Sequence, residues 1–309
     1  MLILGIDGGG VKTVCAVARA DDGEIVGRGA GGPSNYLKEG LFTARASLAE
    51  AVTEALVQAK ATAEQISVVC AGLAGTGRLD DRLRIKRLFV DLLPNARLVL
   101  ETDAFIALVG ATEYRPGLVV ISGAGSIAQG INEKGEAARA GGWGHILGDE
   151  GSGYDIARRG LVAALHAQDG RGPETLIREK LLEHFYLASV DELISYLHQE
   201  GGTPRHIAEM YPLILEAAEE GDAVAQTLLE SAAAALCEAA VAVVRRLSME
   251  DKIFPVCLMG GVFRSSPKMQ ASFQRQFARK VSGAHVQEPL HPPEIGALLI
   301  ARKSLTDAK

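Results

Sequence analysis

The sequence predicts an α/β protein whose two halves each contain a mixed β-sheet. Two observations support this prediction. Short apolar strand patterns alternate with helical patterns along most of the chain, and the same order of elements occurs twice. Each half begins with a strand, a glycine turn, a strand, a second turn and a third strand. Because this order returns without close sequence similarity, we interpret the chain as an internal duplication of one fold.

The first half opens with an apolar strand at residues 2–7, and residues 14–19 show the alternation of a second strand. Asp22-Gly23 predicts a hairpin turn before a third strand at residues 24–28. Three antiparallel strands are then followed by alternating helices and strands, which predicts a mixed sheet. These later elements are helices at residues 38–63 and 80–92 and strands at residues 66–72 and 97–102.

The second half repeats this order after a boundary near residues 114–117. Residues 173–247 are almost wholly helical, which indicates an insertion. We therefore expect domains of residues 1–115 and 116–293, with the last helix, residues 294–309, packed with the first domain near the hinge. The other expected elements are strands at residues 118–122, 128–132, 255–259 and 285–288 and a helix at residues 268–279.

Composition excludes several functional classes. The net charge of −6 and the absence of a basic cluster argue against a nucleic-acid partner. The four cysteines form no CxxC pair, so neither a zinc site nor a disulfide framework is indicated. The most apolar stretch, residues 223–247, carries several charged residues and is typical of a core helix rather than a membrane span. No signal peptide is indicated, and we expect a cytoplasmic enzyme that acts on a small molecule.

The first glycine motif is "GIDGGGVKT" at residues 5–13. Its glycines, Lys12 and Thr13 are reminiscent of a phosphate-binding P-loop, but Val11 interrupts the required spacing and a strand follows where a helix is needed. The second motif, "VVISGAGSIA" at residues 119–128, matches a dinucleotide-binding fingerprint. That match is weak evidence, because a second strand and a hairpin turn follow in place of the helix.

One hypothesis explains both glycine turns. If the halves face each other, backbone N–H groups at the two hairpin tips can hold a polyphosphate from both sides. Asp7, at the end of the first strand, could orient the water molecules of a phosphate-bound Mg²⁺. The predicted nucleotide-binding residues are Gly9, Gly10, Lys12, Thr13, Gly123, Gly125 and Ser126, together with Gly260 and Gly261 after a later apolar strand.

Five motifs then suggest a family. "GIDGGGVKT", "ETDAFIAL", "VVISGAGS", "GGWGHILGDEGSG" and "LMGGV" occur in the order expected of the actin, hexokinase and heat-shock ATPase superfamily. The fourth resembles the N-acetylglucosamine kinase branch, which also contains the benzoyl-CoA reductase-type ATPases. The resemblance runs from residue 2 to about residue 301. It implies two ribonuclease H-like, actin-like ATPase domains with five-stranded sheets, the use of ATP and Mg²⁺, and a homodimer.

The resemblance also implies roles for individual residues. Asp103, at the end of a strand, would accept the proton of the attacking hydroxyl, although its position also suits a helix N-cap. Val11 and Ala124 stand where related sequences often have threonine, so we expect fewer hydroxyl contacts to the nucleotide. The implied sugar-binding residues are Asn35, Tyr36, Asp103, Gly142, Trp143, Gly144, Asp149 and Glu150.

The sequence thus predicts ATP-dependent phosphorylation of an amino sugar, with N-acetylglucosamine and its 6-hydroxyl as the first choice. Glucosamine and N-acetylmuramic acid remain open as substrates. Two other functions remain as alternatives: an ATPase that activates a partner enzyme, and a sugar-sensing regulator. The cysteine positions and the absence of a helix-turn-helix pattern argue against these two.

Overall fold

The computed structural model describes residues 1–77 and 79–306, and its contacts divide the chain into two compact units. Unit 1 comprises residues 1–117 and the segment from Glu288 onward, and unit 2 comprises Leu118–Gln287. The first crossing between the units lies beside the boundary expected after residue 115. The return crossing at Glu288 precedes the expected one at residue 293.

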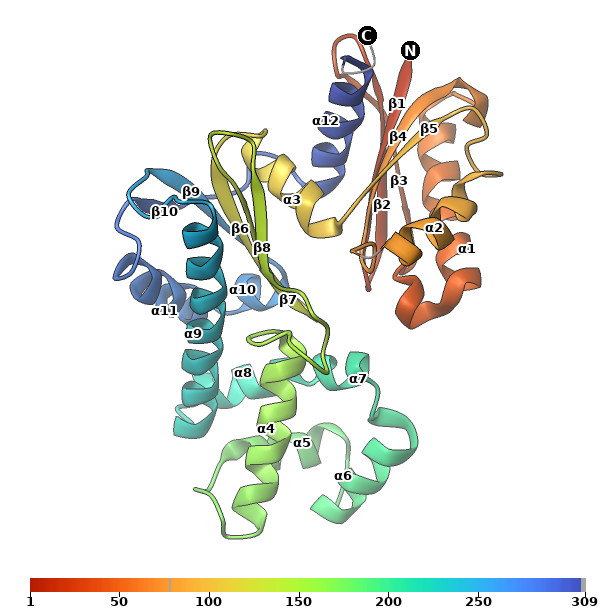
Figure 1. The fold of residues 1–309 in the computed structure, drawn as a ribbon. Helices are drawn as coiled ribbons and strands as arrows, with labels where there is room; N and C mark the ends of the chain where they lie inside the picture. The colour runs from red at the N-terminus through yellow and green to blue at the C-terminus, as the bar shows by residue number, and fades with distance from the viewer. Residues whose placement is uncertain (78, 307–309) are drawn as a thin grey trace. The chain divides into compact units, whose positions relative to one another are not determined.

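Unit 1 contains a five-stranded sheet with the order β3-β2-β1-β4-β5 (Figure 1). Strand β1 pairs antiparallel with β2 and parallel with β4, and β4 pairs parallel with β5. The strands are β1 (Leu2–Gly8), β2 (Thr13–Arg19), β3 (Ile25–Gly31), β4 (Ile66–Leu73) and β5 (Arg97–Glu101). The helices are α1 (Tyr36–Ala59), the short η1 (Ala63–Gln65), α2 (Leu79–Phe89), α3 (Asp103–Thr112) and α12 (Pro293–Thr306).

Helices cover both faces of this sheet, because successive side chains of a strand point to opposite faces. Leu4 of β1 packs in a cluster with Leu48 of α1. Its neighbour Ile3 packs in a second cluster with Ile106 of α3 and Leu298 of α12. The last helix of the chain is therefore an integral layer of unit 1.

Helices α3 and α12 approach each other closely at a pair of glycines, Gly110 and Gly296. A Cβ atom on Gly296 would lie 1.9 Å from the carbonyl oxygen of Ile106, so no larger residue fits there without displacing a helix. This contact fixes α12 against the helix that begins at Asp103.

Unit 2 contains a second five-stranded sheet with the order β10-β9-β6-β7-β8. Counted within each unit, the strands follow the same order in both sheets, which confirms the predicted duplication of the fold. The strands are β6 (Gly117–Ser122), β7 (Ser126–Ile131), β8 (Ala137–Gly141), β9 (Phe254–Met259) and β10 (Ala284–Val286). The helices are α4 (Gly153–Gln168), α5 (Leu176–His184), α6 (Val190–Tyr196), η2 (Leu197–Gly201), α7 (Pro204–Glu209), α8 (Tyr211–Glu219), α9 (Ala223–Arg246), α10 (Gly261–Ser265) and α11 (Pro267–Ala278).

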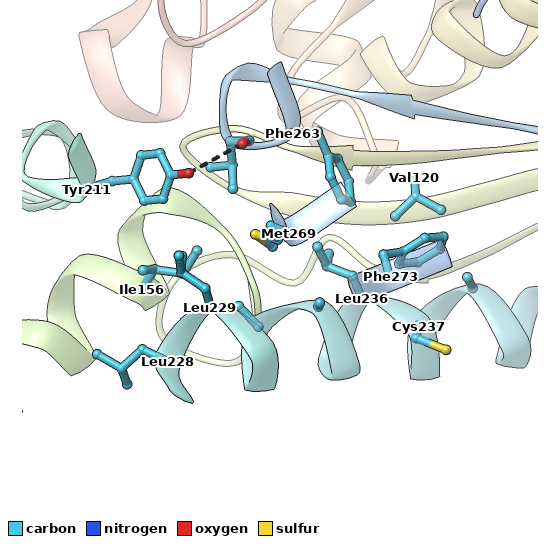
Figure 2. Packing of buried hydrophobic residues seen from close by; sticks show 14 of the residues in the cluster. Val120, Ile156, Tyr211, Leu228, Leu229, Leu236, Cys237, Phe263, Met269 and Phe273 are labelled. Carbon is cyan, nitrogen blue, oxygen red and sulfur yellow. Dashed lines mark hydrogen bonds between the residues drawn. The ribbon is translucent and has the colours of Figure 1, made fainter. Parts of the chain in front are cut away.

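The core of unit 2 forms along helix α9. Figure 2 shows Leu229 and Leu236 of α9 in one cluster with Phe273 of α11, and the Tyr211 hydroxyl donates to the Val262 carbonyl at 3.3 Å. Within the described residues, α9 is the one helix that is long and apolar enough to cross a membrane. More than half of its most apolar window, 56%, is nevertheless buried inside the protein, as the core-helix prediction requires.

Several element boundaries differ from those expected. Helix α1 ends at Ala59 rather than at residue 63, because Lys60 adopts a left-handed conformation and Thr62 forms a capping box with Gln65. Helix α2 ends at Phe89 rather than at residue 92. All four cysteines are buried free thiols.

Candidate functional site

The carboxyl ends of the parallel strands in unit 1 place two aspartates at one edge of the sheet. Asp7 is the penultimate residue of β1, and Asp103 begins α3 two residues after β5. Strands β1, β4 and β5 run parallel, so their carboxyl ends share this edge. Ligands of α/β sheets collect at such edges.

The pKa of Asp7 depends on its burial and on the charged side chains around it. Burial raises the pKa of Asp7 to about 7, and the negative charges of Asp103 and Glu294 act in the same direction. The positive charge of Lys12 opposes this shift. Asp7 is therefore close enough to these three side chains to respond to their charges.

Asp103 is a half-buried carboxylate at the first position of α3. Burial raises its pKa, and a hydrogen bond from the Ala104 N–H to Oδ1, at 2.9 Å, opposes the shift. The N-cap is not Asp103 but Thr102, whose hydroxyl accepts from the Phe105 N–H at 3.1 Å. Capping therefore leaves Asp103 available for another role.

The first glycine turn connects β1 to β2. Its Gly9 N–H donates to the Lys12 carbonyl at 3.1 Å, and the Gly9 carbonyl accepts from the Ser34 N–H at 3.0 Å. Thr13 is fully buried, and its hydroxyl bonds the Gly32 carbonyl and the Ser34 hydroxyl, each at 2.8 Å. The sequence predicted that this hydroxyl donates to a phosphate. In the structure it instead holds the turn against the loop after β3.

The two adjacent residues predicted to bind the sugar, Asn35 and Tyr36, have different contacts in the structure. Asn35 caps α1, since its side-chain oxygen accepts from the Leu37 N–H at 3.2 Å. Tyr36 is 6% exposed in the core of unit 1, and its hydroxyl donates to the Asp81 carboxylate. Tyr36 therefore packs in the core of unit 1, and its predicted contact with the sugar stays a prediction.

The second glycine turn, between β6 and β7, packs directly against residues 149–153 of unit 2. The Ser126 N–H donates to Asp149 Oδ1 at 3.1 Å, and its hydroxyl donates to the Glu150 carbonyl at 2.7 Å. The Gly153 N–H donates to the Gly123 carbonyl at 2.8 Å. The structure thus brings together the predicted phosphate turn and the "DEG" run. The Ser126 hydroxyl, which the sequence analysis assigned to the nucleotide, is engaged here by the Glu150 carbonyl.

The glycine loop, residues 141–148, follows β8 and contains Gly142, Trp143 and Gly144. The Trp143 side chain is 62% exposed in this structure. Two residues further along the loop, His145 contacts Tyr154 of α4 edge-on, with ring centroids 5.3 Å apart. Glu150 is exposed and does not cap α4, because Ser152 performs that role by accepting from the Asp155 N–H.

Three glycines at the predicted nucleotide positions are not required by the protein's own packing. A Cβ atom at Gly10, Gly123 or Gly261 would meet no atom within 4 Å, and none of the three has a positive φ. By contrast, Gly260 has φ +100° and a Cβ there would lie 2.1 Å from the Ser122 carbonyl oxygen. Open space beside the backbone of the first three would let a ligand oxygen approach the main chain.

Sequence reasoning missed the role of Glu294, the second residue of the last helix. Glu294 is buried, accepts from Arg28 Nη1 of β3 at 2.7 Å, and helps to raise the pKa of Asp7. Only the packing of α12 against the first sheet reveals that Glu294 lies near Arg28 and Asp7. A glutamate in the first turn of an apolar helix is the sequence signal that could have drawn attention to it. Among the described residues, no group of three His, Cys, Asp or Glu side chains could hold a metal ion.

The family can be assigned from a comparison with family models. The model of the BadF/BadG/BcrA/BcrD ATPase family matches residues 4–301. The chain belongs to this family. The family prediction made from the sequence motifs is therefore confirmed.

Several relatives of this member of the BadF/BadG/BcrA/BcrD ATPase family are named as sugar kinases. An N-acetylmuramic acid/N-acetylglucosamine kinase of Clostridium acetobutylicum is 35% identical over 97% of this chain and 98% of the relative. An N-acetyl-D-glucosamine kinase of Dictyostelium discoideum is 31% identical over 98% of both chains. A solved candidate N-acetylglucosamine kinase from Chromobacterium violaceum has 28% identity and a TM-score of 0.80, covering 97% of this chain and 98% of its own.

These comparisons confirm the predicted fold class of the family member, two mixed five-stranded sheets of the actin-like ATPase type. The predicted placement of ATP and sugar on particular residues stays a prediction.

Proposed function

We propose that the chain phosphorylates N-acetylglucosamine at its 6-hydroxyl with ATP. The observation that carries this proposal is Asp103, a half-buried carboxylate with a raised pKa at the strand edge of unit 1. A raised pKa makes a carboxylate a better proton acceptor near neutral pH. Relatives that cover nearly the whole chain and are named as amino-sugar kinases support the same chemistry.

The reaction needs one proton acceptor and one phosphoryl donor. As the sugar O6 bonds to the γ-phosphorus of ATP, the bond between that phosphorus and the β,γ-bridging oxygen breaks and ADP leaves. The hydroxyl proton passes to the Asp103 carboxylate. Within its own unit, each glycine turn offers backbone N–H groups to a phosphate: the turn after β1 in unit 1 has open space at Gly10, and the turn after β6 in unit 2 has open space at Gly123.

Mg²⁺ fits the residues present, provided that phosphates and water supply most of its ligands. Asp7 is the side chain that would hold the ion through water, since Mg²⁺ keeps several waters and uses one or two carboxylates beside nucleotide phosphates. The ion would neutralise charge on the phosphates. A nearby cation would also favour the charged form of Asp7, whose pKa is raised to about 7 in the protein alone.

The amino sugar is the finer part of the proposal. Relatives at 35% and 31% identity both carry N-acetylglucosamine in their names, and a third relative, from Vibrio cholerae, is named a glucosamine kinase. Trp143, Asn35, Asp149 and Glu150 are the side chains that we assign to the sugar. The enzyme would act in the cytoplasm, where ATP is available, and as a homodimer.

The alternative of an ATPase that activates a partner enzyme predicts hydrolysis without a sugar. In activators that transfer electrons, cysteines hold an iron–sulfur cluster, but here all four cysteines are buried. Nothing in the geometry therefore favours that function over the kinase.

ADP release from Mg-ATP, measured with N-acetylglucosamine, glucosamine, N-acetylmuramic acid and glucose in turn, tests the proposal. We expect the largest kcat/KM with N-acetylglucosamine and a product whose phosphate NMR signal is that of a 6-phosphate ester. Steady hydrolysis that no sugar stimulates would overturn the kinase. A preference for another amino sugar would overturn only the choice of substrate. Light scattering during gel filtration tests the homodimer.

A further inference from the structure

The glycine loop has a backbone that needs support. Gly141, Gly142 and Gly144 all adopt left-handed conformations, with φ of +76°, +69° and +84°. Glycine loses more backbone entropy on ordering than any other residue, so such a loop does not hold one conformation by itself. Contacts from outside the loop must therefore fix Trp143 in place.

Arg139 of β8 supplies two such contacts. Its guanidinium carbon lies 4.5 Å from the centroid of the Trp143 ring, a cation–π arrangement. Its Nη1 also donates to the Gly141 carbonyl at 2.7 Å. One side chain thus holds both the first residue of the loop and the aromatic ring that the loop carries.

The Arg139 guanidinium contacts the loop, although the side-chain oxygen of Gln129 on the neighbouring strand is also an acceptor. Gln129 of β7 pairs directly with Arg139, and within the described part of the chain its buried Oε1 has no hydrogen-bond partner. The Arg139 guanidinium instead contacts Gly141 and Trp143 of the loop. The Arg139 carbonyl accepts from Arg246 Nη1 at 2.7 Å, which ties this strand to α9.

We propose that Arg139 is a positioning residue for the sugar, and this inference rests on the proposed function. By covering one face of the indole, Arg139 leaves the other face and the ring edge of Trp143 for the substrate. Its bond to Gly141 fixes the loop from which that ring projects. Loss of Arg139 should therefore weaken sugar binding while the phosphoryl-transfer residues, Asp103 and Asp7, stay intact.

The chain offers a direct readout, because Trp143 is its only tryptophan. Intrinsic fluorescence, its anisotropy and its quenching by acrylamide all report on this one ring. The variants are Arg139→Ala, Arg139→Gln and Arg139→Lys, with Arg171→Ala as the matched control. Arg171 is an exposed arginine of unit 2 paired with Asp169 at 2.8 Å, so its loss changes the net charge equally without touching the loop.

We expect Arg139→Ala to raise KM for N-acetylglucosamine about tenfold, with kcat changed less than about threefold, and to increase acrylamide quenching of Trp143. Arg139→Lys should recover most of both effects, because an ammonium group can also lie over the ring. Arg139→Gln should recover less, since an amide can reach the Gly141 carbonyl but carries no charge. Arg171→Ala should behave as the wild type.

Failure of this inference differs from failure of the proposed function. If the wild type phosphorylates N-acetylglucosamine while KM and Trp143 quenching stay unchanged in both Arg139→Ala and Arg139→Gln, Arg139 is not a positioning residue. A fall in kcat as large as the rise in KM, if Arg139→Lys does not reverse it, would also overturn the inference. It would indicate a general structural role for Arg139. If no amino sugar changes Trp143 fluorescence or ADP release in the wild type, the proposed function itself fails.

Discussion

At the scale of single residues, the proposed reaction depends most on the carboxylate of Asp103. Replacing it by asparagine keeps the size of the side chain and its hydrogen bond to Ala104, but removes the proton acceptor. We expect Asp103→Asn to lower kcat by about 10²- to 10⁴-fold, the usual contribution of a general base. Binding of ATP, measured by calorimetry, should be nearly unchanged. Activity near the wild-type level in Asp103→Asn would assign the base elsewhere.

The raised pKa of Asp103 also sets the direction of a pH effect. Its ordinary pKa is 3.8, and burial raises it in the folded protein. The base must be deprotonated to act, so activity is present above the folded pKa and is lost as pH falls through it. We expect the acid limb of kcat/KM for the sugar, measured at saturating Mg-ATP, to lie above pH 3.8. A rate that stays constant down to pH 4 would contradict this.

The positions of some residues in the fold could be predicted from the sequence, and the contacts of others could not. The position of Asp103 was predictable, because a polar residue directly after an apolar strand lies at the carboxyl edge of its sheet. The role of the Thr13 hydroxyl was not, since its partner Ser34 comes from a different loop. The place of Tyr36 after a glycine-rich loop does not show whether its ring points outward or into the core. Only its contact with Asp81 shows that it points into the core.

At the scale of elements, the glycines at the predicted nucleotide positions are of two kinds. Gly10 and Gly123 lie in the turns after β1 and β6, and Gly260 follows β9. Gly10 and Gly123 have open space where a Cβ would lie, whereas Gly260 has neither the space nor a φ that suits another residue. We expect Gly10→Ala and Gly123→Ala to change the free energy of unfolding by less than about 0.5 kcal/mol. Each should raise KM for Mg-ATP severalfold, because the added methyl group lies where a phosphate would approach the backbone.

Gly260→Ala provides the contrast for those two variants. Its Cβ would lie 2.1 Å from the Ser122 carbonyl oxygen in a left-handed backbone, so we expect a loss of about 2–4 kcal/mol in the free energy of unfolding. Denaturant unfolding and ATP kinetics on the same three proteins separate the effects. If Gly10→Ala and Gly123→Ala lose stability without a change in KM, those glycines serve the fold rather than a nucleotide.

The strand order could be predicted element by element because each strand carries its own periodic pattern. Residues 14–19 alternate in the sequence, and β2 is indeed a strand that pairs antiparallel with β1. The place of Arg139 could not be predicted in this way. Its contact with Trp143 depends on the left-handed conformations of three loop glycines, Gly141, Gly142 and Gly144, and no local periodic pattern encodes them.

At the scale of the whole molecule, the two units differ in how the chain builds them. Unit 2 is one continuous segment with its own core, whereas unit 1 needs the returning helix α12. Leu298 and Ala297 of that helix fill a cluster with Ile3 of β1, and Glu294 forms an ion pair with Arg28. Without α12, one face of the first sheet would expose this apolar cluster to water, at a cost of about 25 cal/mol per Å².

This difference predicts how fragments behave. We expect residues 118–287 alone to unfold cooperatively in a circular-dichroism melt, because their core is complete. Residues 1–117 alone should aggregate or remain unfolded, and joining residues 288–309 to them through a flexible linker should restore cooperative unfolding. Leu298→Ala in that joined fragment should cost about 2–5 kcal/mol, as the loss of a buried leucine usually does. If residues 1–117 unfolded as cooperatively without α12 as with it, the helix would be an accessory layer. Its buried Glu294 would then influence Asp7 without contributing to the fold that positions it.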